Sequence, residues 1–185
     1  MFRKVRHAVG EMRYGIKYFF MNSVVAHIPI WHVRKFLYQC AGMKIGRSHI
    51  LMHVITDGWK HIEIGDGVCI NSYCHIDGRG GIRIHDNVSI SVYTKILSAS
   101  HDKDSGEFAY IEKSVEIEDN VWTGINSVIL PGTKMLHGSI LAAGSVAIGK
   151  EYEEYGVYSG VPAVKIGTRK LVKDYDLSRW APWFR

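Results

Sequence analysis

The sequence has 185 residues, of which 46% are hydrophobic and 22% charged, and its formal net charge at pH 7 is +5. A chain of this length buries a core and fits a single compact domain. The moderate basic surplus lacks dense lysine and arginine blocks, so we expect no nucleic-acid partner. Cys40, Cys69 and Cys74 form no CxxC pair, which favours reduced thiols in a cytoplasmic protein.

Residues 1–43 form the first predicted unit, an N-terminal helical segment. Apolar spacing over 9–20 and 32–41, with Pro29 between them, predicts two helices that cap the rest of the chain. The opening stretch is rich in lysine and arginine and contains Glu11 as its acid. This pattern is compatible with peripheral association at the inner face of a membrane, but a solvated helix face is the simpler interpretation.

From Ile64 onward, apolar residues recur at every sixth position. Neither a helix nor an irregular meander sustains this period, whereas a short strand followed by a turn does. Three such units close one triangular coil of about 18 residues, and stacked coils bury the repeated residue. The period therefore predicts an all-β chain folded as a parallel β-helix. Its three runs are Ile64, Ile70, Ile76 and Ile82; Ile84, Ile90 and Ile96; and Ile117, Thr123, Ile129, Met135, Leu141 and Ala147.

The sixfold period fails between Ile96 and Ile117, where the sequence is polar and turn-rich. We therefore predict a loop over 101–114 that leaves the coil. The β-helix unit as a whole is predicted over 44–168. The remaining residues, 169–185, are predicted as a short C-terminal helix or arm that packs on the helix or on another subunit.

Three segments carry a resemblance to a known family: 117–132 (IEDNVWTGINSVILPG), 141–146 (LAAGSV) and 159–163 (SGVPA). With the interrupting loop, they resemble the hexapeptide-repeat acetyltransferases, especially the maltose/galactoside and capsule or polysaccharide O-acetyltransferase branches. The resemblance implies a left-handed β-helix, a departure from the right-handed rule for parallel crossovers. It further implies acetyl-CoA as co-substrate, no metal, and a homotrimer with sites between subunits.

His101 matches the catalytic histidine of that family by position, at the exit from the coil into the predicted loop. Imidazole, with an unperturbed pKa of about 6.5, suits a general base that takes a hydroxyl proton and returns it to a departing thiolate. Without the resemblance, an exposed and idle histidine is the simpler interpretation. Asp102 and Asp77 are candidate partners for the imidazole, and Asp102 equally suits capping of the loop.

Asn71, Asp77 and Asp102 are the residues predicted to bind the acceptor. The resemblance implies a sugar-binding asparagine at Asn71, although asparagine is also a common turn residue. The predicted reaction is O-acetylation of a sugar hydroxyl in the synthesis of a bacterial capsule, exopolysaccharide or lipopolysaccharide. N-acetylation of an amino sugar, free or nucleotide-linked, is the alternative.

The residues predicted to bind coenzyme A lie in the last coils. The resemblance implies that Trp122 lines the acyl and pantetheine tunnel, while small side chains at Gly124, Ala142 and Ala143 allow a ligand to approach the backbone. Core packing and tight corners explain the same residues. The remaining predicted coenzyme contacts are Lys150, Gly160, Pro162, Lys165 and Arg169.

Two other functions fit a β-helix. A zinc hydratase similar to γ-class carbonic anhydrase needs three histidines, two of them spaced H-x4-H. The pair with this spacing, His27 and His32, lies in the predicted helical cap, so no metal site is predicted. A non-enzymatic scaffold is disfavoured by the polar loop, by the placed histidine and by the terminal G-x-P-A motif.

Overall fold

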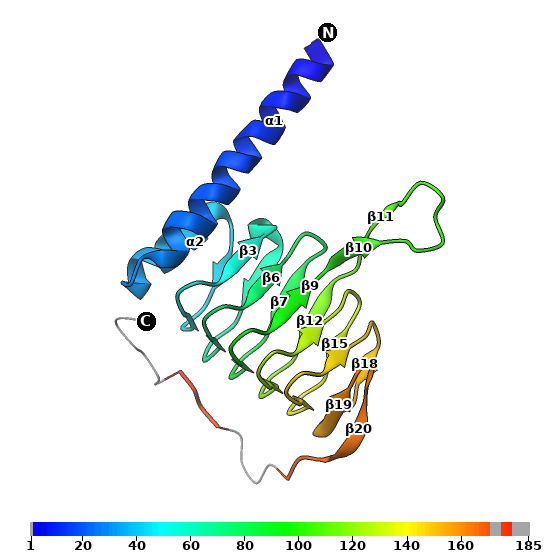
Figure 1. Cartoon of the computed structure of the whole chain (residues 1–185). Coiled ribbons are helices and arrows are strands. Elements are labelled where there is room, and N and C mark those ends of the chain that lie inside the picture. The colour runs from blue at the N-terminus through cyan, green and yellow to red at the C-terminus, as the bar shows by residue number, and fades with distance from the viewer. Residues whose placement is uncertain (1, 171–174, 179–185) are drawn as a thin grey trace.

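The computed structural model describes residues 2–170 and 175–178. Short strands stack on three faces, and successive strands of the chain pass from one face to the next (Figure 1). Pairing between adjacent coils is parallel, as at Ile64 opposite Ile84 on one face and Ile76 opposite Ile96 on another. The predicted parallel β-helix is therefore confirmed.

Each face is a sheet that runs along the stack of described coils. The first face holds β1 (Lys44–Ile45), β4 (Ile62–Ile64), β7 (Ile82–Ile84), β12 (Val115–Ile117), β15 (Lys134–Met135) and β18 (Glu151–Tyr152). The second holds β2 (His49–Ile50), β5 (Cys69–Ile70), β8 (Ser89–Ile90), β13 (Trp122–Thr123), β16 (Ile140–Leu141) and β19 (Gly156–Gly160), with β20 (Ala163–Thr168) antiparallel at its end. The third holds β3 (Ile55–Asp57), β6 (His75–Asp77), β9 (Lys95–Leu97), β14 (Val128–Ile129) and β17 (Val146–Ala147).

The chain turns at three corners, each named after the face that precedes it. The first corner includes 65–67, 85–87 and 118–120; the second includes 71–74, 91–94, 124–127 and 142–145; the third includes 78–81, 98–114, 130–133 and 148–150. At the first corner, the backbone amide of Asp66 donates to Oδ1 of Asp86 at 2.7 Å, and the amide of Asp86 donates to Oδ1 of Asp119 at 2.8 Å. The repeated aspartates thus join successive turns.

A hairpin interrupts the third corner between β9 and β12. Its strands are β10 (Ala99–His101) and β11 (Tyr110–Glu112), which pair antiparallel with His101 opposite Tyr110. Figure 1 shows the hairpin projecting from the coils. The segment predicted as a loop therefore has strands of its own, which hold His101 at a defined position.

Helices precede the first coil: α1 (Phe2–Phe19), the π-helical η1 (Phe20–Val24), the 3-10 turn η2 (Val25–His27) and α2 (Trp31–Ala41). A further 3-10 turn, η3 (Trp59–His61), lies between β3 and β4. The guanidinium of buried Arg34 in α2 donates to the carbonyl of Ile50, at 2.8 Å, and to that of Ile28. In Figure 1 the N-terminal half of α1 extends away from the coils. Of the helices described, none is long and apolar enough to cross a membrane.

The C-terminal segment runs along the first corner. The hydroxyl of Tyr175 donates to the carbonyl of Asn120 at 3.0 Å, and the amide of Leu177 donates to Oδ1 of Asn87 at 3.1 Å. The helix predicted in this segment falls partly on 171–174 and 179–185, outside the described residues. The described residues 175–178 form no helix.

The buried isoleucine ladder should supply much of the stability. Ile76 is 1% exposed, whereas Ile55, one coil earlier on the same face, is 42% exposed. We expect Ile76→Ala to lower the free energy of unfolding by about 2–5 kcal/mol, because it leaves a cavity between coils. The matched control, Ile55→Ala, should cost less than about 1 kcal/mol. Urea unfolding would test this, and equal losses would contradict a core built on this ladder.

Candidate active site

The hairpin holds His101 by one of its two ring nitrogens. Nδ1 lies 3.0 Å from the backbone carbonyl oxygen of Phe108, and the Phe108 ring stacks on the imidazole with 3.9 Å between centroids. In the neutral imidazole, Nδ1–H donates to this carbonyl and Nε2 carries the lone pair. The arrangement therefore prepares Nε2 to accept a proton.

Asp102 stabilises the turn of the hairpin. Its Oδ1 accepts the backbone N–H of Asp104 at 3.0 Å, and its own amide donates to the carbonyl of Ala109 at 2.8 Å. This is the loop-capping geometry that the sequence left as one of two alternatives. A backbone carbonyl, not a carboxylate, is the partner of Nδ1 on His101.

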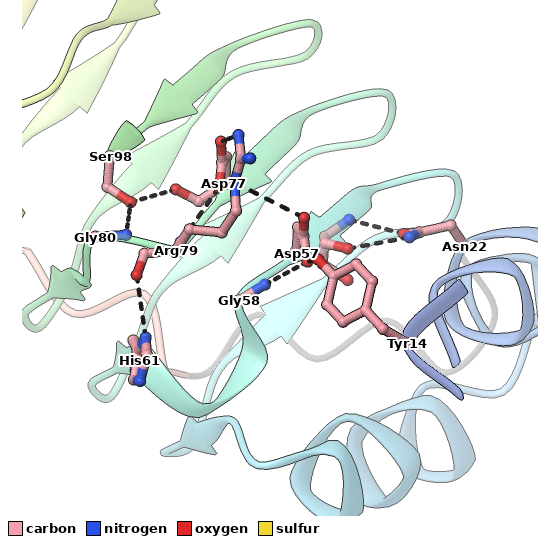
Figure 2. A network of polar contacts seen from close by, with 10 residues as sticks. Tyr14, Asn22, Asp57, Gly58, His61, Asp77, Arg79, Gly80 and Ser98 are labelled. Carbon is pink, nitrogen blue, oxygen red and sulfur yellow. Dashed lines mark hydrogen bonds and ion pairs between the residues drawn. The ribbon is translucent and has the colours of Figure 1, made fainter. Parts of the chain in front are cut away.

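Two aspartates and an arginine meet at the third corner, beside the hairpin. Asp57 and Asp77 occupy equivalent positions in adjacent coils. Arg79 donates to both carboxylate oxygens of Asp77, from Nε at 2.8 Å and from Nη2 at 2.6 Å. Its Nε lies 3.9 Å from Oδ2 of Asp57, and Figure 2 shows Arg79 between the two acids. The bidentate geometry fixes the guanidinium plane.

Hydrogen bonding and opposite charge keep both members of this pair ionised despite burial. Burial of Asp77, whose side chain is 6% exposed, disfavours its charged form. The hydrogen bonds and positive charge of Arg79 outweigh burial, so the pKa of Asp77 is lowered. The same hydrogen bond raises the pKa of Arg79.

Helix α1 closes one side of this corner. The Tyr14 hydroxyl donates to Asp57, as Figure 2 shows. Partial burial and this hydrogen bond raise the pKa of Tyr14, so its hydroxyl stays protonated. The cleft between α1 and the coils has a volume of about 410 Å³ and is lined by Tyr14, Gly15, Tyr18, Asp57, His75, Asp77 and Arg79.

The cleft is rich in groups that recognise hydroxyls. It offers carboxylate acceptors, the guanidinium donor and tyrosine hydroxyls within one small volume. Burial lowers the pKa of His75, and this effect is larger than the rise caused by the negative charge of Asp77. The neutral imidazole of His75 can both donate and accept a hydrogen bond. These groups can therefore hydrogen-bond a hydroxyl of a ligand that enters the cleft.

The cleft is joined to the hairpin of His101. The guanidinium carbon of Arg79 lies 5.6 Å from the Tyr110 ring centroid, which lies 5.8 Å from the imidazole centroid of His101. At the hairpin's base, buried Ser98 donates from Oγ to the Asp77 carbonyl at 2.6 Å and accepts the amide of Gly80 at 2.8 Å. The predicted residues Asp77 and His101 are thus brought to one corner.

Sequence reasoning missed Asp57, Tyr14 and Tyr110 at this corner. Asp57-Gly58 precedes Asp77-Gly78 by one coil in the same register, so the repeat itself was the available signal for Asp57. No local pattern indicates Tyr14, because its contact with Asp57 joins residues 43 positions apart.

Asn71 lies at a different corner from His101 and Asp77. It is part of the second corner, and its side-chain amide donates to the carbonyl of Ile90 at 2.8 Å. This bond joins adjacent coils and accounts for the turn role of Asn71. Within one chain, Asn71 is not brought to the cleft, and its acceptor-binding role remains a prediction.

Most predicted coenzyme residues gather along the second corner and the adjoining face. Trp122 on β13 is 45% exposed, and its indole N–H donates to Oγ of Ser91 at 3.2 Å. A Cβ at Gly124 would lie 2.4 Å from the backbone nitrogen of Ala143 in the next coil, so this position needs glycine. The exposed indole beside small residues fits a narrow aliphatic arm. Ala142 belongs to the same corner.

The terminal G-x-P-A segment, which contains Gly160 and Pro162, also lies beside the second corner. The amide of Gly160 donates to Oγ of Ser145 at 3.1 Å, and Pro162 follows a cis peptide bond. Gly160 lies at the end of β19, which is paired in parallel with β16 of the previous coil. Gly160 therefore adjoins the same corner as Ala142 and Ala143, and Pro162 follows two residues later.

The predicted cations are more scattered. Lys165 on β20 pairs with Glu153 at 2.6 Å. Arg169 donates to the carbonyls of Asn120, at 2.7 Å, and Gly138, at 3.2 Å, on the first corner. Lys150, at the third corner, lies 5.3 Å from the Tyr152 ring centroid. Arg169 and Lys150 are thus not brought to the second corner within one chain.

No family model matches the chain. Galactoside O-acetyltransferase from Lactococcus lactis subsp. lactis (strain IL1403) is 25% identical to it over 126 residues, which cover 66% of this chain and 59% of that relative. dTDP-4-amino-4,6-dideoxy-D-glucose acyltransferase from Escherichia coli is 29% identical over 143 residues, covering 60% of this chain and 74% of that relative.

A solved structure resembles most of the chain. It is a hexapeptide-repeat-containing acetyltransferase from Vibrio cholerae O1 biovar eltor, complexed with acetyl coenzyme A, with a TM-score of 0.73, 26% identity and 86% of each chain covered. The chain is therefore a left-handed parallel β-helix of hexapeptide repeats. The proteins it is similar to are thus named an O-acetyltransferase, an acyltransferase and a hexapeptide-repeat-containing acetyltransferase, which confirms the resemblance predicted from the sequence. Within the described part of the chain, no group of three or more His, Cys, Asp or Glu residues is arranged to hold a metal ion.

Replacing Arg79 should expose the cost of the buried Asp77 carboxylate. We expect Arg79→Gln to lower the free energy of unfolding at pH 7 by about 1–2 kcal/mol, because an ionised acceptor loses its partner. The loss stays below that of a fully buried pair because the Arg79 side chain is 45% exposed. Arg83→Gln is the matched control, since Arg83 pairs with Glu63 on an exposed face.

The difference between these variants should depend on pH. The lowered pKa of folded Asp77 gives stability that is present above the unfolded value of about 3.9 and is lost as pH falls through the lower folded value. Denaturant unfolding at pH 7 and at successively lower pH would measure the effect. Equal stability of the two variants at pH 7 would contradict this role for Arg79.

Proposed function

We propose that the chain is an acetyl-CoA-dependent acyltransferase that acts on a sugar hydroxyl, with His101 as general base. The observation that supports this most directly is the contact between Nδ1 of His101 and the Phe108 carbonyl. It leaves Nε2 of the neutral ring to accept a proton, beside a cleft lined with hydroxyl-binding groups. The relatives named as acetyltransferases support the same reaction class.

His101 serves both halves of the proposed transfer. Nε2 takes the acceptor proton while the hydroxyl oxygen forms its bond to the thioester carbonyl carbon. The C–S bond then breaks, and the imidazolium returns the proton to the departing sulfur. The Phe108 carbonyl stabilises the imidazolium between these steps. The products are a sugar ester and free coenzyme A, with no covalent acyl-enzyme.

The acceptor is proposed to lie in the cleft beside Asp77. Carboxylates that accept hydrogen bonds from sugar hydroxyls suit this position, and Arg79 holds Asp77 ionised for the purpose. We propose that Asn71 binds the sugar, as the resemblance implies, and that Asp102 lies at the edge of the acceptor site. The polymer context, a bacterial capsule, exopolysaccharide or lipopolysaccharide, belongs to the same proposal.

An amino sugar is the second candidate acceptor. It is favoured by the similarity to the dTDP-4-amino-4,6-dideoxy-D-glucose acyltransferase. The product distinguishes the two candidates, because mild alkali cleaves an acetyl ester and leaves an acetamide intact. An acceptor screen with mass detection before and after alkali treatment therefore tests the choice, and an alkali-resistant product would replace the hydroxyl proposal with this one.

We propose that the complete site forms between subunits of a homotrimer. Within one chain, His101 and Asp77 belong to the third corner, whereas Trp122 and Gly124 adjoin the second. These corners are separated by a whole face, roughly 15–20 Å for a six-residue side. A second protomer's second corner, set against the third corner, would bring the thioester to the base. We propose a cytoplasmic location for the assembly.

Removal of the His101 imidazole tests the proposed general base. We expect His101→Ala to lower the rate of thiol release from acetyl-CoA in the presence of a sugar acceptor by about 10²–10⁴-fold, the usual contribution of a general base. His7→Ala, which removes an exposed histidine on α1, should leave the rate unchanged. Unfolding midpoints of both variants would establish that the fold is intact. Wild-type turnover by His101→Ala would contradict the mechanism.

The mass of the assembly in solution tests the proposed homotrimer. Sedimentation equilibrium of the wild-type chain should give the mass of three chains. Acetyl-CoA should bind that species, because the predicted coenzyme residues and the predicted base are contributed by different protomers. A monomer that retains full turnover would contradict a site shared between subunits.

A further inference from the structure

Helix α1 docks on the coils through its polar side. Tyr14 donates its hydroxyl to Asp57, and its ring lies 6.2 Å from that of Trp59. Lys17 donates to the carbonyl of Ala41 at 2.9 Å, and its ammonium lies 4.5 Å from the Trp59 ring centroid. The side of α1 that faces the body of the molecule is thus composed of tyrosine and lysine.

The opposite side of α1 is apolar and exposed. Val9, Met12, Ile16 and Phe19 are 42%, 60%, 62% and 65% exposed, respectively. Their spacing of three, four and three residues places them in one row along the helix, which we call the apolar stripe. With 3.6 residues per turn, this row lies across the helix from Tyr14. Contiguous exposed apolar surface of this kind marks an interaction site.

Positive charge borders the apolar stripe. Arg13 is four residues after Val9 and three before Ile16, and Arg6 is three before Val9, so both arginines adjoin the same edge of the stripe. The opposite edge carries Ala8 and Gly15. The acid of this helix, Glu11, is three residues after Ala8 and four before Gly15, so it lies behind that edge, farther from the stripe than either residue. The stripe is therefore apolar along its centre and cationic along one side.

This charge pattern disfavours a second copy of α1 as the partner. In a parallel pair of stripes the arginine edge would meet Ala8 and Gly15, which supply no opposite charge. In an antiparallel pair the arginine edges would meet each other and repel. An anionic lipid surface complements both features, because it takes apolar side chains into its interface and attracts the adjoining guanidinium groups.

We propose that α1 lies in the interface of an anionic phospholipid membrane, with the apolar stripe inserted and Arg6 and Arg13 at the headgroups. Tyr14 and Tyr18 on the other side of the helix line the cleft with Asp57 and Asp77. A helix with side chains is about 10–12 Å across, so the cleft lies that far above the lipid. This inference rests on the proposed function, and it identifies the acceptor as a glycan that is joined to a membrane lipid.

Vesicle flotation tests the membrane contact directly. The wild-type chain should float with vesicles of phosphatidylglycerol and phosphatidylcholine, and more weakly with phosphatidylcholine alone. Met12→Glu/Ile16→Glu should lower the partition coefficient by about tenfold or more, because a charge replaces each inserted side chain. Arg6→Gln/Arg13→Gln should weaken binding to the anionic vesicles and leave binding to phosphatidylcholine vesicles unchanged. Ile166→Glu, at an equally exposed residue on β20, is the matched control and should float as the wild type does.

Three results would overturn the proposal. The first is wild-type binding by Met12→Glu/Ile16→Glu, and the second is no flotation of the wild type with anionic vesicles. The third is a lower sedimentation mass for Met12→Glu/Ile16→Glu than for the wild type, because it would assign the apolar stripe to a second copy of the chain.

Turnover of a water-soluble acceptor separates this proposal from the proposed function. Met12→Glu/Ile16→Glu should acetylate the water-soluble acceptor at the wild-type rate. The same variant should lose turnover of that glycan when the glycan is anchored in vesicles. Equal turnover of the anchored glycan by this variant and the wild type would overturn the assignment of a lipid-joined acceptor. Full turnover by His101→Ala would remove the proposed function and leave the flotation result standing.

Discussion

In-register stacking of the coils is the constraint on which the rest of the structure depends. Parallel strands in adjacent coils lie about 4.8 Å apart, so every corner must repeat with the same spacing. A Cβ at Gly124 would lie 2.4 Å from the backbone nitrogen of Ala143, and one at Gly80 would lie 2.2 Å from the carbonyl oxygen of Ser98. Glycine is required at both positions because neighbouring backbone cannot retreat without opening the stack. The buried isoleucines and the aspartates of the first corner satisfy the same repeat.

The candidate active site lies where the regular repeat of the coils is interrupted. The hairpin of β10 and β11 leaves the third corner, and Ser98 at its base bonds to both Asp77 and Gly80. The buried hydroxyl of Ser98 thereby couples the position of the hairpin to the turn that carries Arg79. A catalytic side chain on a projecting element gains precision when its root is fixed in this way.

The fold was predictable because each hexad repeats the same physical problem: one apolar residue to bury and one corner to turn. The position of His101 at a break in that period was predictable for the same reason. The Nδ1 partner of His101 was not, because a backbone carbonyl has no sequence signature and Phe108 is seven residues away. Asp57 could have been found from its register with Asp77. Tyr14 could not, since its contact depends on how α1 crosses the first coil.

The orientation of α1 links the cleft to the surface of the molecule. Rotation of this helix to bury Ile16 would remove Tyr14 from Asp57 and Lys17 from the carbonyl of Ala41. It would also open the wall of the cleft, because Tyr14 and Tyr18 line it. The exposure of the apolar stripe is therefore a consequence of the contacts that form the cleft. Contact between the apolar stripe and water is unfavourable, and insertion into an apolar phase would remove that contact.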